Sequence, residues 1–339
     1  MYKKTACIFI LFLSAIPAMG SDFAIEVVSY KNLHSTGLYD DPNSVLGKPT
    51  TWVDFFGKAA ACSLVYPAWK DPNGGKLITT IAEDANIVVK FDHKISDDQG
   101  NPYGTDFLVF GNTLFRGDGV FANMAEYFIV SDANESSEPV MVSIAQNPGG
   151  PWFTFSKEHC GDTPFPTNAF MWNRDTNDWG AELNWLKPVN PALNTFAFIG
   201  YSVADAIELY DGSAGGTGFD LKDLDPNDYA ALAVDPNTGR KWIQYIKVEY
   251  LPSGDYPGEI DGFSDVAGGG DYRHPVGDLN IDGKVDYSDL ALLGDYWLYN
   301  ITSYKDAGVI ADLNEDGVVN FRDFAVLAKN WRKCTIGCN

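Results

Sequence analysis

Basic residues are scarce in this 339-residue chain. It has 24 lysines and arginines against 46 aspartates and glutamates, which gives a formal net charge of −22. A surface this acidic is repelled by phosphate backbones, so we expect no nucleic-acid partner. Only four histidines and five cysteines are present, and their spacing does not resemble a zinc site. Hydrophobic residues, at 45%, are nevertheless numerous enough for a sizeable folded core.

Long apolar runs are missing, except for a short one near the N-terminus. Two lysines precede an almost entirely apolar stretch over residues 6–17, and small residues follow it. A membrane-spanning helix needs about 20 apolar residues, so this stretch is too short to be one. We predict a secretory signal peptide over residues 1–20, cleaved between Gly20 and Ser21. The mature chain is then exported, with no membrane span.

An exported chain can form disulfides. Four cysteines remain after cleavage, and three pairings are open: Cys62, Cys160, Cys334 and Cys338. Cys334 and Cys338 could close a small C-terminal loop. Cys62 and Cys160 would then either pair with each other or remain free thiols.

Residues 21–266 have the composition of strands and loops. Runs rich in β-branched and aromatic residues alternate with Gly, Pro, Asn and Asp, at 87–91, 107–110, 127–130, 140–144 and 243–248. The last run alternates apolar and polar residues, which indicates one buried and one exposed face. Amphipathic helices are scarce, and Val203–Tyr210 is the best short candidate. These features predict a mainly β domain, an antiparallel β-sandwich.

The composition changes after residue 266. Residues 267–276 contain three consecutive glycines, which predicts a glycine-rich linker. Residues 277–333 have helical periodicity and should form a small α-helical domain, and residues 334–339 a C-terminal tail.

Two copies of one pattern make up this C-terminal segment. When the segment is shifted by 34 residues, Asp278–Asp289 lies on Asp312–Asp323. The match continues at helical spacing, with Leu290, Leu293 and Trp297 on Phe324, Leu327 and Trp331. Each copy is therefore a twelve-residue loop followed by one helix.

Both loops have the pattern of a calcium site. Oxygen side chains at positions one, three and five converge on one point, and glycine at position six permits the turn. Position seven supplies a carbonyl, position nine often acts through water, and a carboxylate at position twelve closes the cage. The loops contain no His or Cys, so their hard oxygen ligands favour calcium over a transition metal or magnesium.

A duplicated loop–helix unit without a helix before the first loop resembles the dockerin type I module. The resemblance covers about residues 277–333. It implies two calcium ions, folding that depends on them, and docking onto a cohesin partner. Carried over by position, the metal ligands would be Asp278, Asn280, Asp282, Lys284 (carbonyl), Asp286 and Asp289, then Asp312, Asn314, Asp316, Val318 (carbonyl), Asn320 and Asp323.

The same resemblance assigns partner recognition to loop positions ten and eleven. In the family these are typically small hydroxyl residues that are alike in both repeats. Here they are Tyr287 and Ser288 in the first loop, and Phe321 and Arg322 in the second. This departure concerns the partner and the symmetry of docking, and it leaves the calcium assignment unaffected.

Familiar catalytic motifs are missing from the larger domain. HExxH, GxSxG and glycine-rich phosphate loops do not occur. The many acidic residues leave room for a glycosidase-type carboxylate pair, although no pair stands out. Asp106, Glu126 and Glu182 lie in or near apolar strands, where a pKa could be raised. The acidic clusters at 220–228 and 255–265 are either solvated loops or a further calcium site.

Four tryptophans lie close together in a segment rich in Asn, Asp and Pro: Trp152, Trp172, Trp179 and Trp185. Exposed tryptophan rings stack on sugar faces, which makes these residues candidates for carbohydrate binding. The alternative is that they pack a long loop against the sandwich.

Motifs in the larger domain, at residues 104–112, 216–221, 242–248 and 261–263, carry a second resemblance. They are similar to those of exported bacterial cell-surface proteins, often dockerin-bearing, whose function is unknown. That resemblance implies a jelly-roll-like sandwich with no established activity.

We therefore expect an antiparallel, jelly-roll-like β-sandwich followed by a small α-helical, calcium-binding, dockerin-like domain. The favoured function is noncatalytic binding or surface display outside the cell, with a cohesin-like partner and an association with polysaccharide. The alternative is a glycan-active hydrolase carrying a dockerin, either a glycoside hydrolase or another polysaccharide-active enzyme. A binder predicts an exposed row of Trp or Tyr, and an enzyme predicts two carboxylates roughly 5–10 Å apart in a cleft.

Overall fold

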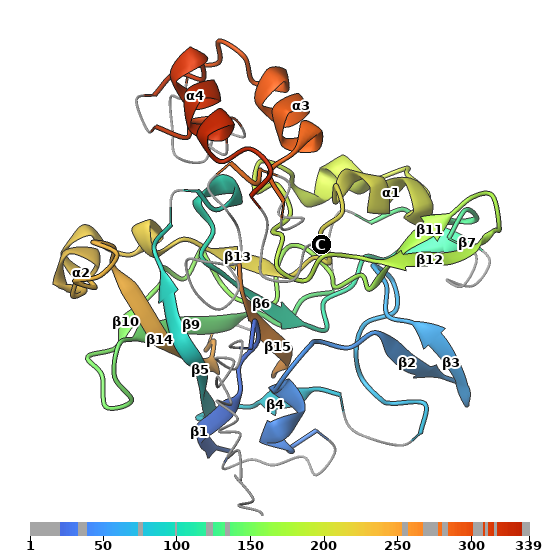
Figure 1. Ribbon diagram of the computed structural model, residues 1–339. Coiled ribbons are helices and arrows are strands. Elements are labelled where there is room, and N and C mark those ends of the chain that lie inside the picture. Colours follow the sequence, from blue (N-terminus) through green and yellow to red (C-terminus); the bar gives the residue numbers. More distant parts are fainter. Residues whose placement is uncertain are drawn as a thin grey trace, which may run out of the picture.

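The computed structural model describes residues 21–32, 39–73, 77–98, 100–119, 125–132, 136–252, 257–266, 277–279, 284–300, 308, 311–314 and 317–333. The strands lie before residue 266, and two helices lie near the C-terminal end of the chain (Figure 1), namely α3 (Tyr287–Asp295) and α4 (Phe321–Lys329). The prediction of a mainly β fold followed by C-terminal helices is confirmed.

Two antiparallel sheets form the larger part. The first has five strands, in the order β1 (Glu26–Lys31), β5 (Asn86–Ser96), β14 (Trp242–Tyr250), β9 (Val140–Ala145) and β10 (Phe153–Thr154). The second has four, in the order β13 (Thr217–Phe219), β6 (Phe107–Gly111), β15 (Gly258–Asp265) and β4 (Thr79–Ile81).

The two sheets pack face to face around one hydrophobic core. Its buried side chains come from both sheets, among them Val89, Phe107, Ile144, Phe219, Ile246 and Ile260. Phe107 and Phe219 lie opposite each other on β6 and β13 and stack with ring centroids 5.0 Å apart. Full burial of such a side chain stabilises the fold by roughly 1.5–3 kcal/mol. The larger part is thus a β-sandwich, and the jelly-roll strand order stays a prediction.

A second core lies on the other face of the four-stranded sheet. Leu108 and Phe110 face this side, because successive residues of a strand point to opposite faces. Three hairpins and one helix cover them: β2 (Trp52–Phe55) with β3 (Lys58–Ala61), β7 (Gly117–Gly119) with β8 (Phe128–Val130), β11 (Phe170–Asn173) with β12 (Asp178–Glu182), and α1 (Val203–Leu209). Helix α1 corresponds to the predicted Val203–Tyr210. This covering layer was not predicted.

Short helical turns complete the larger part: η1 (Pro42–Val45), η2 (Pro102–Gly104), η3 (Thr195–Phe198), η4 (Leu221–Asp223) and α2 (Pro226–Ala231). The predicted signal peptide, linker and tail, at residues 1–20, 267–276 and 334–339, lie outside the described residues. In the described ranges, no helix has the length and apolar character needed to cross a bilayer.

Cys62 and Cys160 are both buried free thiols. The Sγ atom of Cys160 donates a hydrogen bond to the carbonyl oxygen of Lys157, at 2.9 Å. The sequence left open whether Cys62 and Cys160 form a disulfide with each other or remain free thiols, and in the structure both are free thiols. Cys334 and Cys338 lie outside the described residues.

Candidate functional site

The two loops that the sequence analysis assigned to calcium lead directly into α3 and α4. Nine of the twelve predicted ligand residues are described: Asp278, Lys284, Asp286, Asp289, Asp312, Asn314, Val318, Asn320 and Asp323. Asn280, Asp282 and Asp316 lie outside the described residues.

The aspartate at position twelve closes each loop. Asp289 is fully buried, and its two carboxylate oxygens accept hydrogen bonds from the backbone N–H groups of Leu279 and Asp286, both at 2.7 Å. Asp323 is equally buried and accepts from backbone N–H groups at positions three and nine of its own loop, at 3.1 and 2.7 Å. Each carboxylate thereby joins the beginning of a loop to its end.

Position nine marks the start of each helix. Asp286 and Asn320 are the N-cap residues of α3 and α4, and each forms a capping box with the position-twelve aspartate. A capping box satisfies two backbone N–H groups at the end of a helix, which explains why both helices begin at the same place in the repeat.

Each loop is hydrogen-bonded to the segment that follows the opposite helix. The N–H of Val285 donates to the carbonyl of Lys333 (2.9 Å), and its carbonyl accepts from the N–H of Arg332 (2.8 Å). Val319 forms the matching pair of bonds with residues 298–299, at 2.9 and 3.0 Å. Residues 298–299 and 332–333 are equivalent in the repeat. The loop of each repeat is therefore hydrogen-bonded, in a crosswise manner, to the segment that follows the helix of the other repeat.

The four predicted partner-contacting residues are all exposed at the N-terminal ends of the two helices: Tyr287, Ser288, Phe321 and Arg322. The ring of Tyr287, 77% exposed, packs edge-on against Trp331 at 5.1 Å. Phe321, 75% exposed, packs in the same way against Trp297 at 4.9 Å. The repeat thus presents two similar aromatic surfaces, which differ in charge because only the second carries an arginine.

The donor set of the module fits calcium. Asp278, Asp289 and Asp323 are at most 6% exposed, and buried carboxylates are costly unless they are paired, hydrogen-bonded or bound to a metal. The remaining described ligands would supply amide, carboxylate or carbonyl oxygens, which are the ligands that calcium takes.

Residues 276–330 match the family model of the dockerin type I domain. The prediction of a dockerin module at the C-terminus is therefore confirmed, and domains of this type bind calcium. The number of bound ions stays a prediction. No curated protein and no solved structure matches this chain.

The four tryptophans proposed for carbohydrate binding are unequally placed. Trp172 and Trp185 are buried, whereas Trp152 and Trp179 are partly exposed. Trp172 packs edge-on against Trp179 at 5.2 Å, and the ammonium group of Lys247 lies 5.2 Å from the ring of Trp152. Carbohydrate binding by this group stays a prediction that depends mainly on Trp152 and Trp179.

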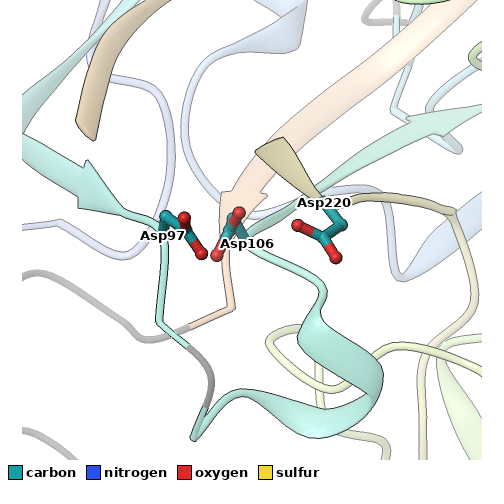
Figure 2. Close-up of side chains that lie close together, drawn as sticks. All are labelled: Asp97, Asp106 and Asp220. Atoms are coloured by element: carbon teal, nitrogen blue, oxygen red, sulfur yellow. The ribbon is translucent and has the colours of Figure 1, made fainter. Parts of the chain in front are cut away.

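Three aspartates at strand ends meet at one end of the sandwich (Figure 2). Asp97 follows β5, Asp106 precedes β6 and Asp220 follows β13, and one carboxylate oxygen of each lies within 4.8 Å of the others. All three are at most 8% exposed. The sequence analysis named Asp106 and a cluster that contains Asp220, but it missed Asp97. Asp97 and Asp106 lie at the two ends of the connection between β5 and β6, and the pairing of β13 with β6 brings Asp220 beside them.

Burial dominates the acid–base behaviour of this cluster. It raises the pKa of Asp106 well above its usual range, and the charges of Asp220 and Asp97 raise it further. Burial also raises the pKa of Asp220, to about 7. The expectation of a raised pKa is thus confirmed for Asp106.

The other two acidic candidates, Glu126 and Glu182, accept hydrogen bonds from neighbouring side chains. Glu126 accepts hydrogen bonds from Trp172 (3.0 Å) and Arg174 (3.2 Å). Burial raises the pKa of Glu182, but hydrogen bonds from Lys48 and Trp185 outweigh this and lower it overall. The expectation of a raised pKa is therefore wrong for Glu182, because its donors stabilise the ionised form.

A further pair of acids, Glu138 and Glu259, hydrogen-bond to each other. Burial and the charge of Glu259 raise the pKa of Glu138 to about 7. The hydrogen-bonded carboxyl groups of Glu138 and Glu259 are therefore closer together than the two carboxyl groups of a glycoside hydrolase, which are roughly 5–10 Å apart.

Proposed function

We propose that this is a secreted, noncatalytic binding or surface-display protein that docks onto a cohesin-like partner in a calcium-dependent manner. The docking module is the predicted domain over residues 277–333, behind a signal peptide, the β-sandwich and a glycine-rich linker. Dockerin domains imply calcium-dependent docking to cohesin, and proteins that carry them are typically extracellular or at the cell surface. The match over residues 276–330 is the main support for this role.

The exposed aromatic side chains Tyr287 and Phe321 indicate which surfaces of the module contact the partner. Each lies at the loop position assigned to partner recognition, at the start of a helix that its loop would position when calcium is bound. Exposed aromatic and arginine side chains are enriched at the energetic centres of protein interfaces. We therefore assign the principal contact to the surface formed by Phe321 and Arg322, with Tyr287 and Ser288 forming the second surface.

Surface plasmon resonance against a panel of purified cohesin domains tests this assignment, with calcium or with EGTA present. Binding is expected in calcium and should be lost in EGTA. Phe321→Ala should weaken binding at least about tenfold, because interface anchors of this kind contribute about 1.4 kcal/mol or more. Tyr287→Ala should have a smaller effect.

The matched control is Phe196→Ala, which removes an equally exposed phenylalanine (72%) from η3 of the larger part. It should leave cohesin binding unchanged. Binding that persists in EGTA would contradict the proposed role. Equal losses in Phe321→Ala and Tyr287→Ala would show instead that the module docks in two orientations.

The sandwich is proposed to bind polysaccharide through Trp152 and Trp179. A glycan array probed with the whole chain, and read for both retention and release of sugar, tests this part separately. Retention that is lost in Trp152→Ala or Trp179→Ala supports the binding role. Sugar release would favour the hydrolase alternative.

A further inference from the structure

We propose that Asp97, Asp106 and Asp220 form a binding site for one hard divalent cation, calcium, within the β-sandwich. This site lies in the larger part of the chain and is separate from the loops that precede α3 and α4 (Figures 1 and 2).

The spacing of the three carboxylates fits a shared ion. Calcium–oxygen distances are about 2.3–2.6 Å, so two oxygens bound to one ion lie at most about 5 Å apart. One oxygen from each aspartate lies within 4.8 Å of the other two. Figure 2 shows Asp97 and Asp220 on either side of Asp106, with their carboxylates turned toward it.

One carboxylate oxygen of the cluster has no hydrogen-bond partner among the residues that the structure describes. Asp220 is 5% exposed; its Oδ1 atom accepts from the N–H of Lys222 at 2.8 Å, whereas its buried Oδ2 atom has no hydrogen-bond partner. A buried carboxylate oxygen left in this state is destabilising, and metal coordination is one of the few ways to satisfy it.

The remaining contacts hold the carboxylates in position. Asp106 accepts from the N–H groups of Asp98 (3.1 Å) and Leu221 (2.9 Å). Asp97 accepts from the hydroxyl group of Tyr229 and lies 3.6 Å from the ammonium group of Lys222. Lys222 compensates at most one of the three negative charges, so a divalent cation would bring the site close to neutrality.

The chemistry of the site favours calcium over a softer metal. The three side chains supply only oxygen ligands. His159 is the nearby imidazole, and its two ring nitrogens are directed to other groups: the carbonyl of Gly218 at 2.8 Å and the carboxylate of Asp223 at 3.5 Å. Hard, all-oxygen sites suit calcium, and magnesium is the expected weaker competitor.

Such an ion would connect the two sheets. Asp97 lies at the end of β5 in the five-stranded sheet, whereas Asp106 and Asp220 lie at the ends of β6 and β13 in the four-stranded sheet. One cation would therefore fasten one end of the sandwich across its core, which makes a structural role the natural one.

The test uses the whole chain with both loop aspartates replaced, Asp289→Ala and Asp323→Ala, hereafter the loop-disabled chain. Calcium alone is the probe, with magnesium for comparison. The loop-disabled chain should retain one calcium ion per chain by calorimetry. Its sandwich should melt about 5–10 °C higher at calcium concentrations 100-fold above the dissociation constant.

Asp220→Asn in the loop-disabled chain is the discriminating variant. Asparagine keeps Oδ1 as an acceptor for Lys222 and replaces the unpartnered oxygen with an NH₂ group, which cannot ligate a cation. The variant should lose the calcium response and yet melt at the same or a higher temperature than its parent without calcium, which separates loss of the site from misfolding. Asp118→Asn, at an exposed aspartate of β7, should change neither property.

Two results would overturn the proposal. One is a loop-disabled chain with no calcium-dependent change in melting temperature and no retained ion. The other is a calcium response that survives Asp220→Asn. Because docking of the C-terminal module is read by cohesin binding, failure here leaves the proposed function of that module intact.

Discussion

Several ionisable side chains in this protein are held by hydrogen bonds, some from the same loop and some from distant positions in the sequence. Asp289 and Asp323 receive backbone N–H groups from their own loops. In the sandwich, His93 joins Asp92 to Asp265, with both nitrogen–oxygen distances at 2.7 Å. Because each partner is left without compensation when the other is removed, single substitutions at these residues should be costly.

We predict that Asp323→Ala lowers the stability of the C-terminal module and its calcium affinity. The substitution removes a predicted calcium ligand and leaves two backbone N–H groups without acceptors, at a cost of about 1–3 kcal/mol each. Helix content against temperature, by circular dichroism, and calcium titration by calorimetry measure the two effects. Asp295→Ala is the matched control, at an exposed aspartate of α3. Equal effects in both variants would contradict the assignment.

The stability contributed by His93 should depend on pH. Burial lowers the pKa of His93, but its bonds with Asp265 and Asp92 outweigh this and raise the pKa above the ordinary value. A raised folded-state pKa means that the contribution is fully present below about pH 6.5 and is lost as pH rises through the folded-state value.

His93→Gln tests this sign. In denaturant unfolding, the free energies of unfolding of wild type and variant should differ more at pH 5.5 than at pH 8.5. A difference that stays constant or grows with pH would show that the two carboxylates do not stabilise the charged imidazole.

At the scale of helices and strands, features that depend on local sequence were predicted more successfully than features that depend on pairing between distant strands. Helices α3 and α4 begin at the capping residues of the repeat, so a local motif was enough to predict them. The alternation in residues 243–248 predicted the strand β14 but not its faces: a register shift between Ile243 and Tyr245 interrupts the alternation, and Tyr245 is buried in a different cluster from Ile246. The layer over Leu108 and Phe110 was not predictable, because it combines hairpins from three separate regions. In the aspartate cluster, the position of Asp220 beside Asp106 was not predictable either, because it depends on the pairing of β13 with β6.

Removal of calcium should melt α3 and α4 while the sheets stay folded. Among the described residues of the module, the core consists of six small or medium-sized buried hydrophobic side chains, Leu279, Val285, Leu293, Ala311, Val319 and Leu327. A core of this size needs the metal for stability. Hydrogen exchange with and without EGTA should show lost protection in α3 and α4 and retained protection in β5 and β14. Helix protection that is unaffected by EGTA would contradict the metal-dependent fold.

At the scale of the whole molecule, the sandwich and the C-terminal module each have a hydrophobic core of their own, with no residue in common. Their stabilities should therefore be separable. Under the proposed function, separable stabilities would let the C-terminal module dock independently of what the sandwich binds.

Ile246→Ala tests this separation. Ile246 is fully buried in β14, and its truncation should lower the unfolding free energy of the sandwich by about 2–5 kcal/mol. The calcium affinity of the C-terminal module should be the same in wild type and variant, as measured by calorimetry. A change in that affinity would show that the two parts are energetically coupled.

The crosswise hydrogen bonds of Val285 and Val319 have a thermodynamic consequence for the two loops. An ion that orders the first loop also fixes the segment after α4, and an ion in the second loop fixes the segment after α3. If both loops bind calcium, the first binding event supplies part of the ordering that the second requires, and we predict that the two events are positively cooperative. Calcium titration of the module should rise with a Hill coefficient above one, as a single switch between a docking-competent and an incompetent state.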